Sequence, residues 1–407
     1  MLKIISTKEL RIGMFVQQMQ GAWFDHPFWR RSFLLNDPED LNKLLASNIE
    51  SVQIDTEKSL VEIKAEIIAD ACGDDSVAEL KKIKTPKVRT PRVSAADEHQ
   101  TAMQLIMSSK ALVKRMFSDV RMGKALNAED ALPLVNEIVA SVARNQGAIT
   151  SLVRLKSKDN YTYMHSVAVC VLMVALAREL GLNEEQIRQA GVAGLYHDVG
   201  KMAIPEEILI KPAALSDAEF VVMRKHSEFG HAILSRSKQM DDVCLDVCLH
   251  HHEKMDGTGY PHKMKGSEIS IFAKMGAVCD VYDAITSDRP YKAGWEPGIA
   301  LHRMAQWAGH FDPEILKAFV KCIGIYPIGS LVKLKSGRLA VVIDQSESSL
   351  LTPVVKVIFS TKSMMRIKPE VVHLAKIGGQ DEILGHEDPR VWEISDLHSI
   401  WENGRDD

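Results

Sequence analysis

The stretch 191–205, GVAGLYHDVGKMAIP, decides how the central part of this chain folds. Its apolar residues predict a buried helix, and Gly200 and Pro205 predict that this helix ends near His197 and Asp198. Adjacent helical residues point about 100° apart, so this imidazole and this carboxylate are able to serve two different metal ions. Considered alone, the pair is more typical of a helix cap followed by a solvated lysine.

The lysine after this pair lies on the same side of the helix. Lys201 follows His197 by four residues and Asp198 by three, a spacing that places its ammonium on their face. In a phosphate-binding site, the ammonium is expected there to meet a phosphate oxygen or the leaving oxygen.

A second stretch, 248–261, reads CLHHHEKMDGTGYP and contains the consecutive histidines His250, His251 and His252. Three imidazoles are costly to bury in an apolar interior without partners, and a metal site supplies such partners. A lone histidine is more often structural than a metal ligand. The prediction therefore rests on clustering, since eight of the fifteen histidines lie between residues 165 and 262.

Three further residues extend the candidate ligand set. His226 lies in KHSEFGHAIL, His165 begins an apolar helix in YMHSVAV, and Asp280 follows an apolar run in AVCDVYDAIT. Asp283 is a weaker candidate, because a carboxylate there can also orient a ligand from outside the coordination sphere. Imidazoles and carboxylates without thiolates favour iron, manganese or another borderline divalent ion over a structural zinc site.

Two such ions about 3.5–4 Å apart lower the pKa of a shared water and neutralise charge on the phosphate oxygens. Hydrolysis of a phosphodiester by a hydroxide bridging the two metals is therefore the expected reaction. The later string TSDRPYKA supplies Arg289 and Lys292. Their cations are suited to clamp substrate phosphates, although both are also typical of ordinary surface charge.

The composition indicates a soluble globular protein, with 407 residues, 46% of them hydrophobic and 26% charged. A net charge of -4 argues against a nucleic-acid polymer as partner. Charged residues interrupt the apolar run near Met1, so we expect a cytoplasmic protein without membrane insertion. The six cysteines lack CxxC spacing and are expected to be reduced thiols.

The pattern divides the chain into six segments. In order they are a small α/β accessory domain, a basic proline-containing linker, connecting helices, a mainly α catalytic domain, a short β-rich extension and an acidic tail: 1–75, 76–94, 95–155, 156–326, 327–378 and 379–407. The charge of the linker also permits a phosphate-binding arm. In the β-rich extension, a turn is expected at Ser336-Gly337.

In their order, these motifs resemble the HD-GYP family, the bacterial branch of the HD-domain phosphohydrolases that hydrolyses cyclic di-GMP. The resemblance runs from about Tyr161 to Lys292, and HHExxDGxGYP is its most specific string. It implies a helical HD-type domain with seven metal ligands: His165, His197, Asp198, His226, His251, His252 and Asp280.

The resemblance also implies how these residues work. Asp198 would bridge the two ions, iron or manganese, Lys201 would contact the scissile phosphate, and the dinucleotide would face three side chains: Tyr260, Arg289 and Lys292. Some relatives hold a third metal through a glutamate one helical turn before the first histidine. Because Tyr161 has that position here, two ions are expected.

The implied activity is metal-dependent hydrolysis of cyclic di-GMP to linear pGpG, GMP or both, in bacterial second-messenger signalling. One alternative is a phosphohydrolase acting on another cyclic dinucleotide or a nucleotide. Another is a non-catalytic signalling module that binds a GGDEF diguanylate cyclase, although the complete ligand set disfavours it.

The expected partners besides the substrate are GGDEF-domain proteins and, in a homodimer, a second copy of this chain. The segment before the linker resembles a small domain often found ahead of HD-GYP domains, for which we expect a regulatory or oligomerising role.

Overall fold

A computed structural model provides the fold. The described residues are 2–7, 10, 14–20, 33–35, 41, 45, 51–55, 93–153, 161–211, 213–288, 294–346, 349–394, 396, 397 and 400. The predicted clamp residues Arg289 and Lys292 and most of the basic linker lie outside them. The chain divides into two units, Met1–Lys64 and Ala65–Asp407.

The first unit contains an antiparallel sheet with strand order β1-β4-β2-β3. Its strands are β1 (Leu2–Ser6), β2 (Phe15–Gln20), β3 (Phe33–Leu34) and β4 (Ser51–Asp55). Its core consists of buried apolar side chains: Leu10, Val16, Leu35, Val52 and Ile54. The sheet supplies the β part of the expected small α/β domain. Between β3 and β4, Leu41 and Leu45 are described, and both are helical.

The described part of the second unit starts at residue 93 and contains two long helices, α3 (Ala95–Arg121) and α4 (Leu132–Leu152), with the short helix η4 (Ala128–Asp130) between them. Glu98 of α3 is buried, and its carboxylate accepts hydrogen bonds at 2.6 and 2.8 Å from the Arg144 guanidinium of α4. The Ser141 hydroxyl donates to the same carboxylate at 2.8 Å. A partly buried ion pair with further hydrogen bonding therefore joins the two helices, since the Arg144 side chain is 32% exposed.

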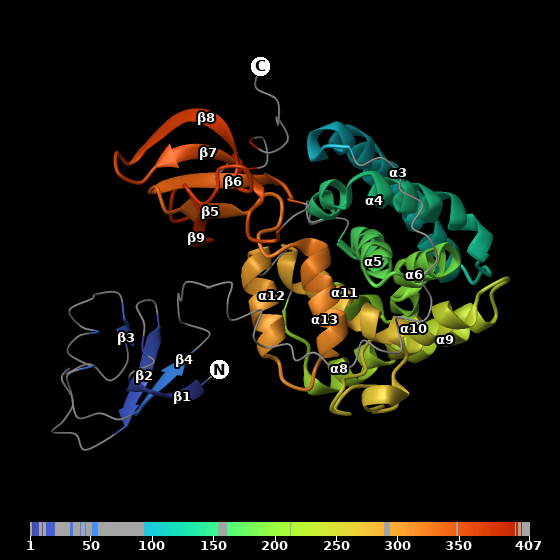
Figure 1. Ribbon diagram of the computed structural model, residues 1–407. Coiled ribbons are helices and arrows are strands. Elements are labelled where there is room, and N and C mark those ends of the chain that lie inside the picture. The colour runs from blue at the N-terminus through green and yellow to red at the C-terminus, as the bar shows by residue number, and fades with distance from the viewer. Residues whose placement is uncertain are drawn as a thin grey trace. The chain divides into compact units, whose positions relative to one another are not determined.

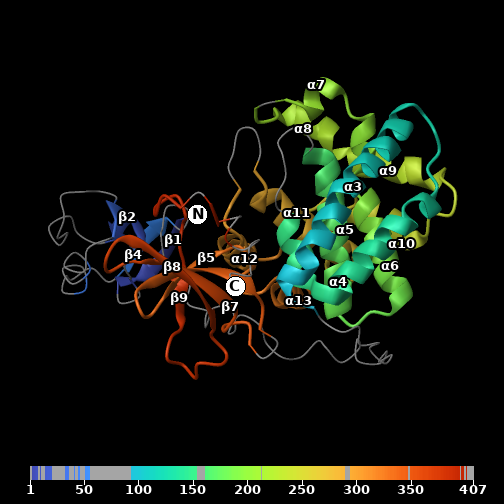
Figure 2. The ribbon, with the colours of Figure 1, turned by 90° about the horizontal axis from the view of Figure 1, so that it is seen from above.

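The central element is α5 (Tyr161–Glu179). Every residue from Val167 to Ala177 is at most 2% exposed, because α3, α4, α6, α11 and α13 all contact this helix (Figures 1 and 2). A helix that is apolar on every side belongs inside a core. Thr162–Glu179 is long and apolar enough to cross a membrane, but 78% of it is buried within the protein, as expected for a core helix.

The remaining helices surround α5 and carry the motifs. They are α6 (Glu184–Tyr196), η6 (Val199–Ala203), α7 (Glu206–Leu209), α8 (Asp217–Arg224), α9 (His226–Ser235), α10 (Asp242–His250), η7 (Gly266–Glu268), α11 (Ile271–Thr286), α12 (Pro297–Gln306) and α13 (Pro313–Ile323). This confirms a mainly α fold. The five cysteines within the described residues are free and buried, as predicted.

The backbone of η6 packs directly on α9. A Cβ added at Gly200 would lie 1.9 Å from the carbonyl oxygen of His226 and 2.3 Å from the amide nitrogen of Gly230. Only glycine permits this approach. Gly200 therefore helps to end α6 and also brings the His197-Asp198 pair next to His226.

A five-stranded antiparallel sheet follows the helices, with the order β8-β7-β6-β5-β9. Its strands are β5 (Leu331–Leu334), β6 (Arg338–Asp344), β7 (Val354–Ser360), β8 (Met365–His373) and β9 (Ile383–His386). The predicted turn lies between β5 and β6, where Gly337 has a φ of 77°. The sheet continues past residue 378 into the segment expected to be an acidic tail, because β9 pairs with the edge of β5.

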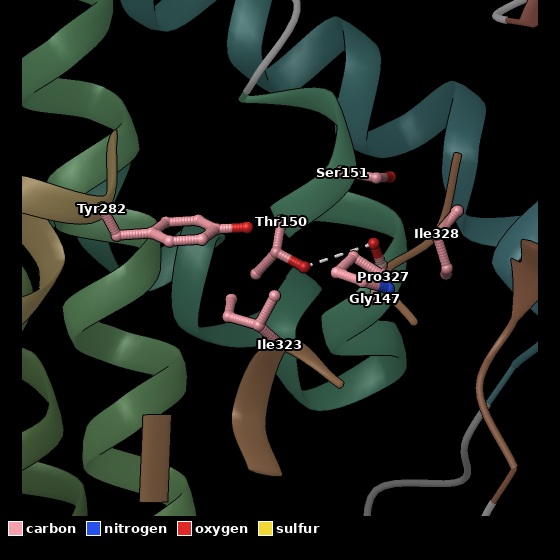
Figure 3. Close-up of a pocket in the computed structure, with 7 residues that line it drawn as sticks. All are labelled: Gly147, Thr150, Ser151, Tyr282, Ile323, Pro327 and Ile328. Atoms are coloured by element: carbon pink, nitrogen blue, oxygen red, sulfur yellow. Dashed lines mark hydrogen bonds between the residues drawn. The ribbon is translucent and has the colours of Figure 1, made fainter. Parts of the chain in front are cut away.

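The sheet is attached to the helices at the chain segment between α13 and β5. Figure 3 shows a small pocket at this attachment, lined by Gly147, Thr150, Ser151, Tyr282, Ile323, Pro327 and Ile328. The hydroxyl of Thr150 donates to the carbonyl oxygen of Gly147 at 3.3 Å. The Ser330 hydroxyl donates to the Glu296 carboxylate at 2.7 Å, which ties the start of β5 to the start of α12.

Candidate metal centre

The fold brings all seven predicted ligands together from five helices and their ends. They are His165 in α5, His197 at the end of α6, Asp198 before η6, His226 at the start of α9, His251 and His252 after α10, and Asp280 in α11. Their ligand atoms form two groups, and within each group all atoms lie within 4.8 Å of one another. The seven residues are separated by up to 115 positions in the sequence, so only packing of the helices can unite them.

The first group, which we call the carboxylate half-site, consists of His165, His197, Asp198 and Asp280. The Nε2 atom of His165 lies 3.3 Å from Asp198 Oδ2 and 3.0 Å from Asp280 Oδ1. The Nε2 atom of His197 lies 3.3 and 3.8 Å from the same two oxygens. Two imidazoles and two carboxylates thus point at one small volume, and all four residues are buried.

The second group, the imidazole half-site, consists of His226, His251 and His252. The Nε2 atom of His226 lies 3.5 Å from Nε2 of His251 and 3.2 Å from Nε2 of His252. This half-site has no carboxylate of its own. The Oδ1 atom of Asp198 lies 3.4 Å from His226 Nε2 and 3.9 Å from His251 Nε2.

Asp198 therefore links the half-sites, because Oδ2 faces one and Oδ1 faces the other. Asp280 also lies between them, with Oδ1 3.0 Å from His165 Nε2 and Oδ2 3.8 Å from His252 Nδ1. Both Asp198 Oδ1 and His197 Nε2 are buried and have no hydrogen-bond partner among the described residues. Buried polar atoms are normally paired, since an unpaired one is costly. These orphaned atoms and the surrounding imidazole and carboxylate donors fit divalent cations.

Three histidines are oriented by backbone carbonyls. Each donates from Nδ1 to a carbonyl oxygen of the preceding turn: His197 to Gly194 at 2.8 Å, His226 to Met223 at 2.7 Å and His251 to Val247 at 2.9 Å. A carbonyl only accepts, so Nδ1 carries the proton in each ring. In the neutral imidazole the Nε2 lone pair is then available towards the centre, as metal ligation requires.

His165 is oriented by a carboxylate instead. Its Nδ1 lies 2.6 Å from Oδ2 of Asp283, which follows Asp280 by three residues on α11. Asp283 thus contacts a candidate ligand from behind, which is the role that the sequence left open beside direct ligation. A carboxylate in this position fixes the ring and strengthens the imidazole as a donor.

The electrostatics of the two half-sites differ. Burial opposes protonation of His165, but hydrogen bonds with Asp198, Asp280 and Asp283 outweigh it and raise its pKa to about 10. Burial, reinforced by the neighbouring His197, lowers the pKa of His251 to about 3. The carboxylate half-site therefore attracts positive charge, whereas the imidazole half-site presents neutral rings.

The pKa of Asp198 lies well below its usual range, although burial opposes this. The Lys201 ammonium is the largest of the effects that outweigh burial, and His197 follows. Lys201 donates a hydrogen bond to Asp198 Oδ2. The structure thus places the predicted phosphate contact directly against the carboxylate that links the half-sites.

The predicted substrate-facing residues are only partly described. Tyr260 stacks on the ring of His252, with centroids 4.7 Å apart and an interplanar angle of 29°. Arg289 and Lys292 lie outside the described part of the chain, so their placement stays a prediction.

Two residues near the site had no predicted role. Glu253 is buried, and its carboxylate accepts hydrogen bonds from the amides of His262 at 2.6 Å and Met264 at 3.1 Å. It thereby holds the loop that contains Tyr260. The only signal for Glu253 was its place in HHExxDGxGYP. The Arg224 guanidinium lies 5.2 Å from the centroid of the Tyr260 ring, a contact between distant segments that no local pattern indicates.

Two protein families match this chain. Residues 139–315 match the HD domain, and residues 2–131 match a domain of unknown function, DUF3391. All seven candidate ligands lie within the HD match. The fold and the site thus define an HD-domain protein with an N-terminal accessory region.

Similar proteins narrow this class. The chain is 50% identical over 403 residues to the cyclic di-GMP phosphodiesterase PA4108 of Pseudomonas aeruginosa, covering 98% of this chain and 96% of that protein. It is 35% identical over 198 residues to the cyclic di-GMP phosphodiesterase response regulator RpfG of Xanthomonas campestris, covering 47% and 52% respectively. It is 37% identical over 169 residues to the 3'3'-cGAMP-specific phosphodiesterase 2 of Vibrio cholerae, covering 41% and 32%. The chain belongs to the HD-GYP family of HD-domain phosphodiesterases.

Proposed function

We propose that this protein hydrolyses the phosphodiester bonds of cyclic di-GMP to linear pGpG, GMP or both. The observation that carries the proposal is the convergence of two ligand groups on opposite oxygens of Asp198. The choice of substrate is supported by a relative that is 50% identical over nearly the whole chain and is a cyclic di-GMP phosphodiesterase.

We further propose two divalent ions, iron or manganese, as cofactors. His165, His197 and Asp280 would hold one ion, the three histidines of the imidazole half-site would hold the other, and Asp198 would contact both. When bound, such ions lower the pKa of a water and neutralise charge on the phosphate oxygens. The described donors contain no thiolate, which agrees with iron or manganese.

The protein's own residues would supply position and charge. Lys201 carries its ammonium beside Asp198 Oδ2, where a phosphate oxygen held at the centre would meet its N–H donors. The side chains of His197 and Asp198 are at most 1% exposed, so bulk water is excluded from the metal-facing floor of the site. The rings of His252 and Tyr260 stack on each other at the partly exposed side of the imidazole half-site, where they would contact a purine base.

A second candidate substrate is 3'3'-cGAMP. The observation that favours it is the 37% identity between this chain and a 3'3'-cGAMP-specific phosphodiesterase over 169 residues. The metal ligands indicate which reaction is catalysed, but they say less about which dinucleotide is the substrate. The cytoplasmic location, GGDEF-domain partners and a homodimer are further proposals that accompany this function.

The test uses protein purified without oxygen, with its metal content measured. Cyclic di-GMP and 3'3'-cGAMP are supplied separately at equal concentration, and products are followed by chromatography. We expect about two ions per chain and faster loss of cyclic di-GMP, with pGpG appearing first. Full metal loading without turnover of either dinucleotide would contradict the proposed function, and faster turnover of 3'3'-cGAMP would replace the substrate.

A further inference from the structure

Arg224, the last residue of α8, lies at the edge of the site and belongs to none of the motifs. Its side chain is exposed, and its guanidinium carbon lies 4.6 Å from the centroid of the Phe220 ring and 5.2 Å from that of Tyr260. Tyr260 in turn stacks on His252 of the imidazole half-site. Arginine, tyrosine and histidine thus form a row that leads from the surface to the candidate metal ligands.

The charge of Arg224 is not neutralised by an ion pair with any carboxylate among the described residues. The Lys201 ammonium, by contrast, contacts the carboxylate of Asp198. Phe220 and Tyr260 contact the guanidinium through their rings and place no carboxylate against its five N–H donors. Those donors remain available to an anion.

We propose that Arg224 is a substrate-binding residue that holds the phosphate of the cyclic dinucleotide not undergoing hydrolysis. This inference rests on the proposed function, because a cyclic dinucleotide presents two phosphates and the metal centre engages one. A planar guanidinium binds phosphate oxygens through two parallel hydrogen bonds. The contacts with Phe220 and Tyr260 restrict the arginine in advance, so less entropy is lost when the anion binds.

The experiment compares two substrates in the metal-loaded, full-length protein. Cyclic di-GMP has a second phosphate, whereas bis(p-nitrophenyl) phosphate has only the one that reacts. For Arg224→Gln we expect KM for cyclic di-GMP to rise about 10- to 100-fold, the range of a lost charged hydrogen bond. We expect kcat to change less than about threefold, because binding is lost equally in the ground and transition states.

Two variants separate binding from a structural role. Arg224→Lys keeps the charge without the planar fork and should recover part of the loss in KM. Arg236→Gln removes an exposed arginine from the far end of α9, about 15 Å along that helix, and should leave both substrates unaffected. In the wild type, KM for cyclic di-GMP should rise with salt more steeply than in Arg224→Gln.

Results that contradict the role of Arg224 can be distinguished from results that contradict the proposed function. A wild type that does not hydrolyse cyclic di-GMP would contradict the proposed function and remove the basis of the inference. An active wild type together with an unchanged KM in Arg224→Gln would overturn the inference alone. Equal losses of kcat/KM on the two substrates would also overturn it, because such losses indicate damage to the centre itself.

Discussion

The two half-sites share Asp198 but differ in charge and in burial. The carboxylate half-site combines two imidazoles with two carboxylates, whereas the imidazole half-site has three rings, approached by Oδ1 of Asp198 at 3.4 Å from His226 and by Oδ2 of Asp280 at 3.8 Å from His252. Four of the five histidines are at most 3% exposed, whereas the His252 side chain is 21% exposed. The two ions proposed here would therefore not be equivalent, because the ion held by two carboxylates would bind more tightly than the ion held by three neutral rings.

Loss of the shared residue should have the largest effect. Asp198→Asn keeps the shape but removes the charge that both half-sites use, so both ions should be lost. We expect kcat/KM to fall on the order of a thousandfold, about 4 kcal/mol of transition-state stabilisation. Metal analysis and turnover of cyclic di-GMP measure this, with the exposed Asp217→Asn as the matched control. Retention of two ions and activity would contradict the site assignment.

Loss of the second carboxylate should have the next largest effect. Asp280→Asn leaves the carboxylate half-site with a single charge, because only Asp198 remains. We expect one ion per chain instead of two and a fall in kcat/KM of roughly a hundredfold, about 2.7 kcal/mol. Because the lost donor is buried and charged, a moderate excess of metal should not restore activity. Full recovery with added metal would show that the half-sites are equivalent.

His252→Gln tests the imidazole half-site. It removes a partly exposed neutral donor, so the imidazole half-site should lose its ion while the carboxylate half-site keeps one. We expect a roughly tenfold to hundredfold fall in kcat/KM at limiting metal. Titration with excess manganese should recover much of it, unlike Asp280→Asn. A variant that loses both ions would instead indicate that the half-sites fill together.

The smallest effect is expected for Asp283, which contacts the candidate ligand His165 but belongs to neither half-site. Asp283→Asn retains a hydrogen-bond acceptor for Nδ1 of His165 but removes the negative charge that strengthens this imidazole. Such partners typically contribute about 10- to 100-fold to metal affinity. We therefore expect weaker binding at the carboxylate half-site, measured by competition with a chelator, and near-normal activity when metal is saturating. Unchanged chelator resistance would exclude this role for Asp283.

Much of the site follows from local pattern. The apolar run before His197 together with Gly200 predicted the end of α6, and the structure ends that helix at Tyr196. The consecutive histidines similarly mark the end of α10. These features depend on the spacing of apolar side chains and on the conformational freedom of glycine. Both act over a few neighbouring residues, so they can be recognised in the sequence.

Other parts of the chain were harder to predict. The strand β9 lies in a segment whose acidic composition indicated a tail, because pairing with the edge of β5 outweighs its local character. Arg224 had no signal either, since its contact with Tyr260 joins α8 to a loop 36 residues further along. Long-range contacts of this kind depend on how whole elements pack.

The sequence by itself determined the types of donor, the helical elements that carry them and the predicted chemistry of two metal ions. Only the tertiary structure decided how the seven donors divide, with Oδ2 of Asp198 facing His165 and Oδ1 facing His226. The physical reason is the close approach of η6 to α9 at Gly200. Spacing along a chain predicts which residues share a helix face, whereas the packing of helices determines which atoms meet.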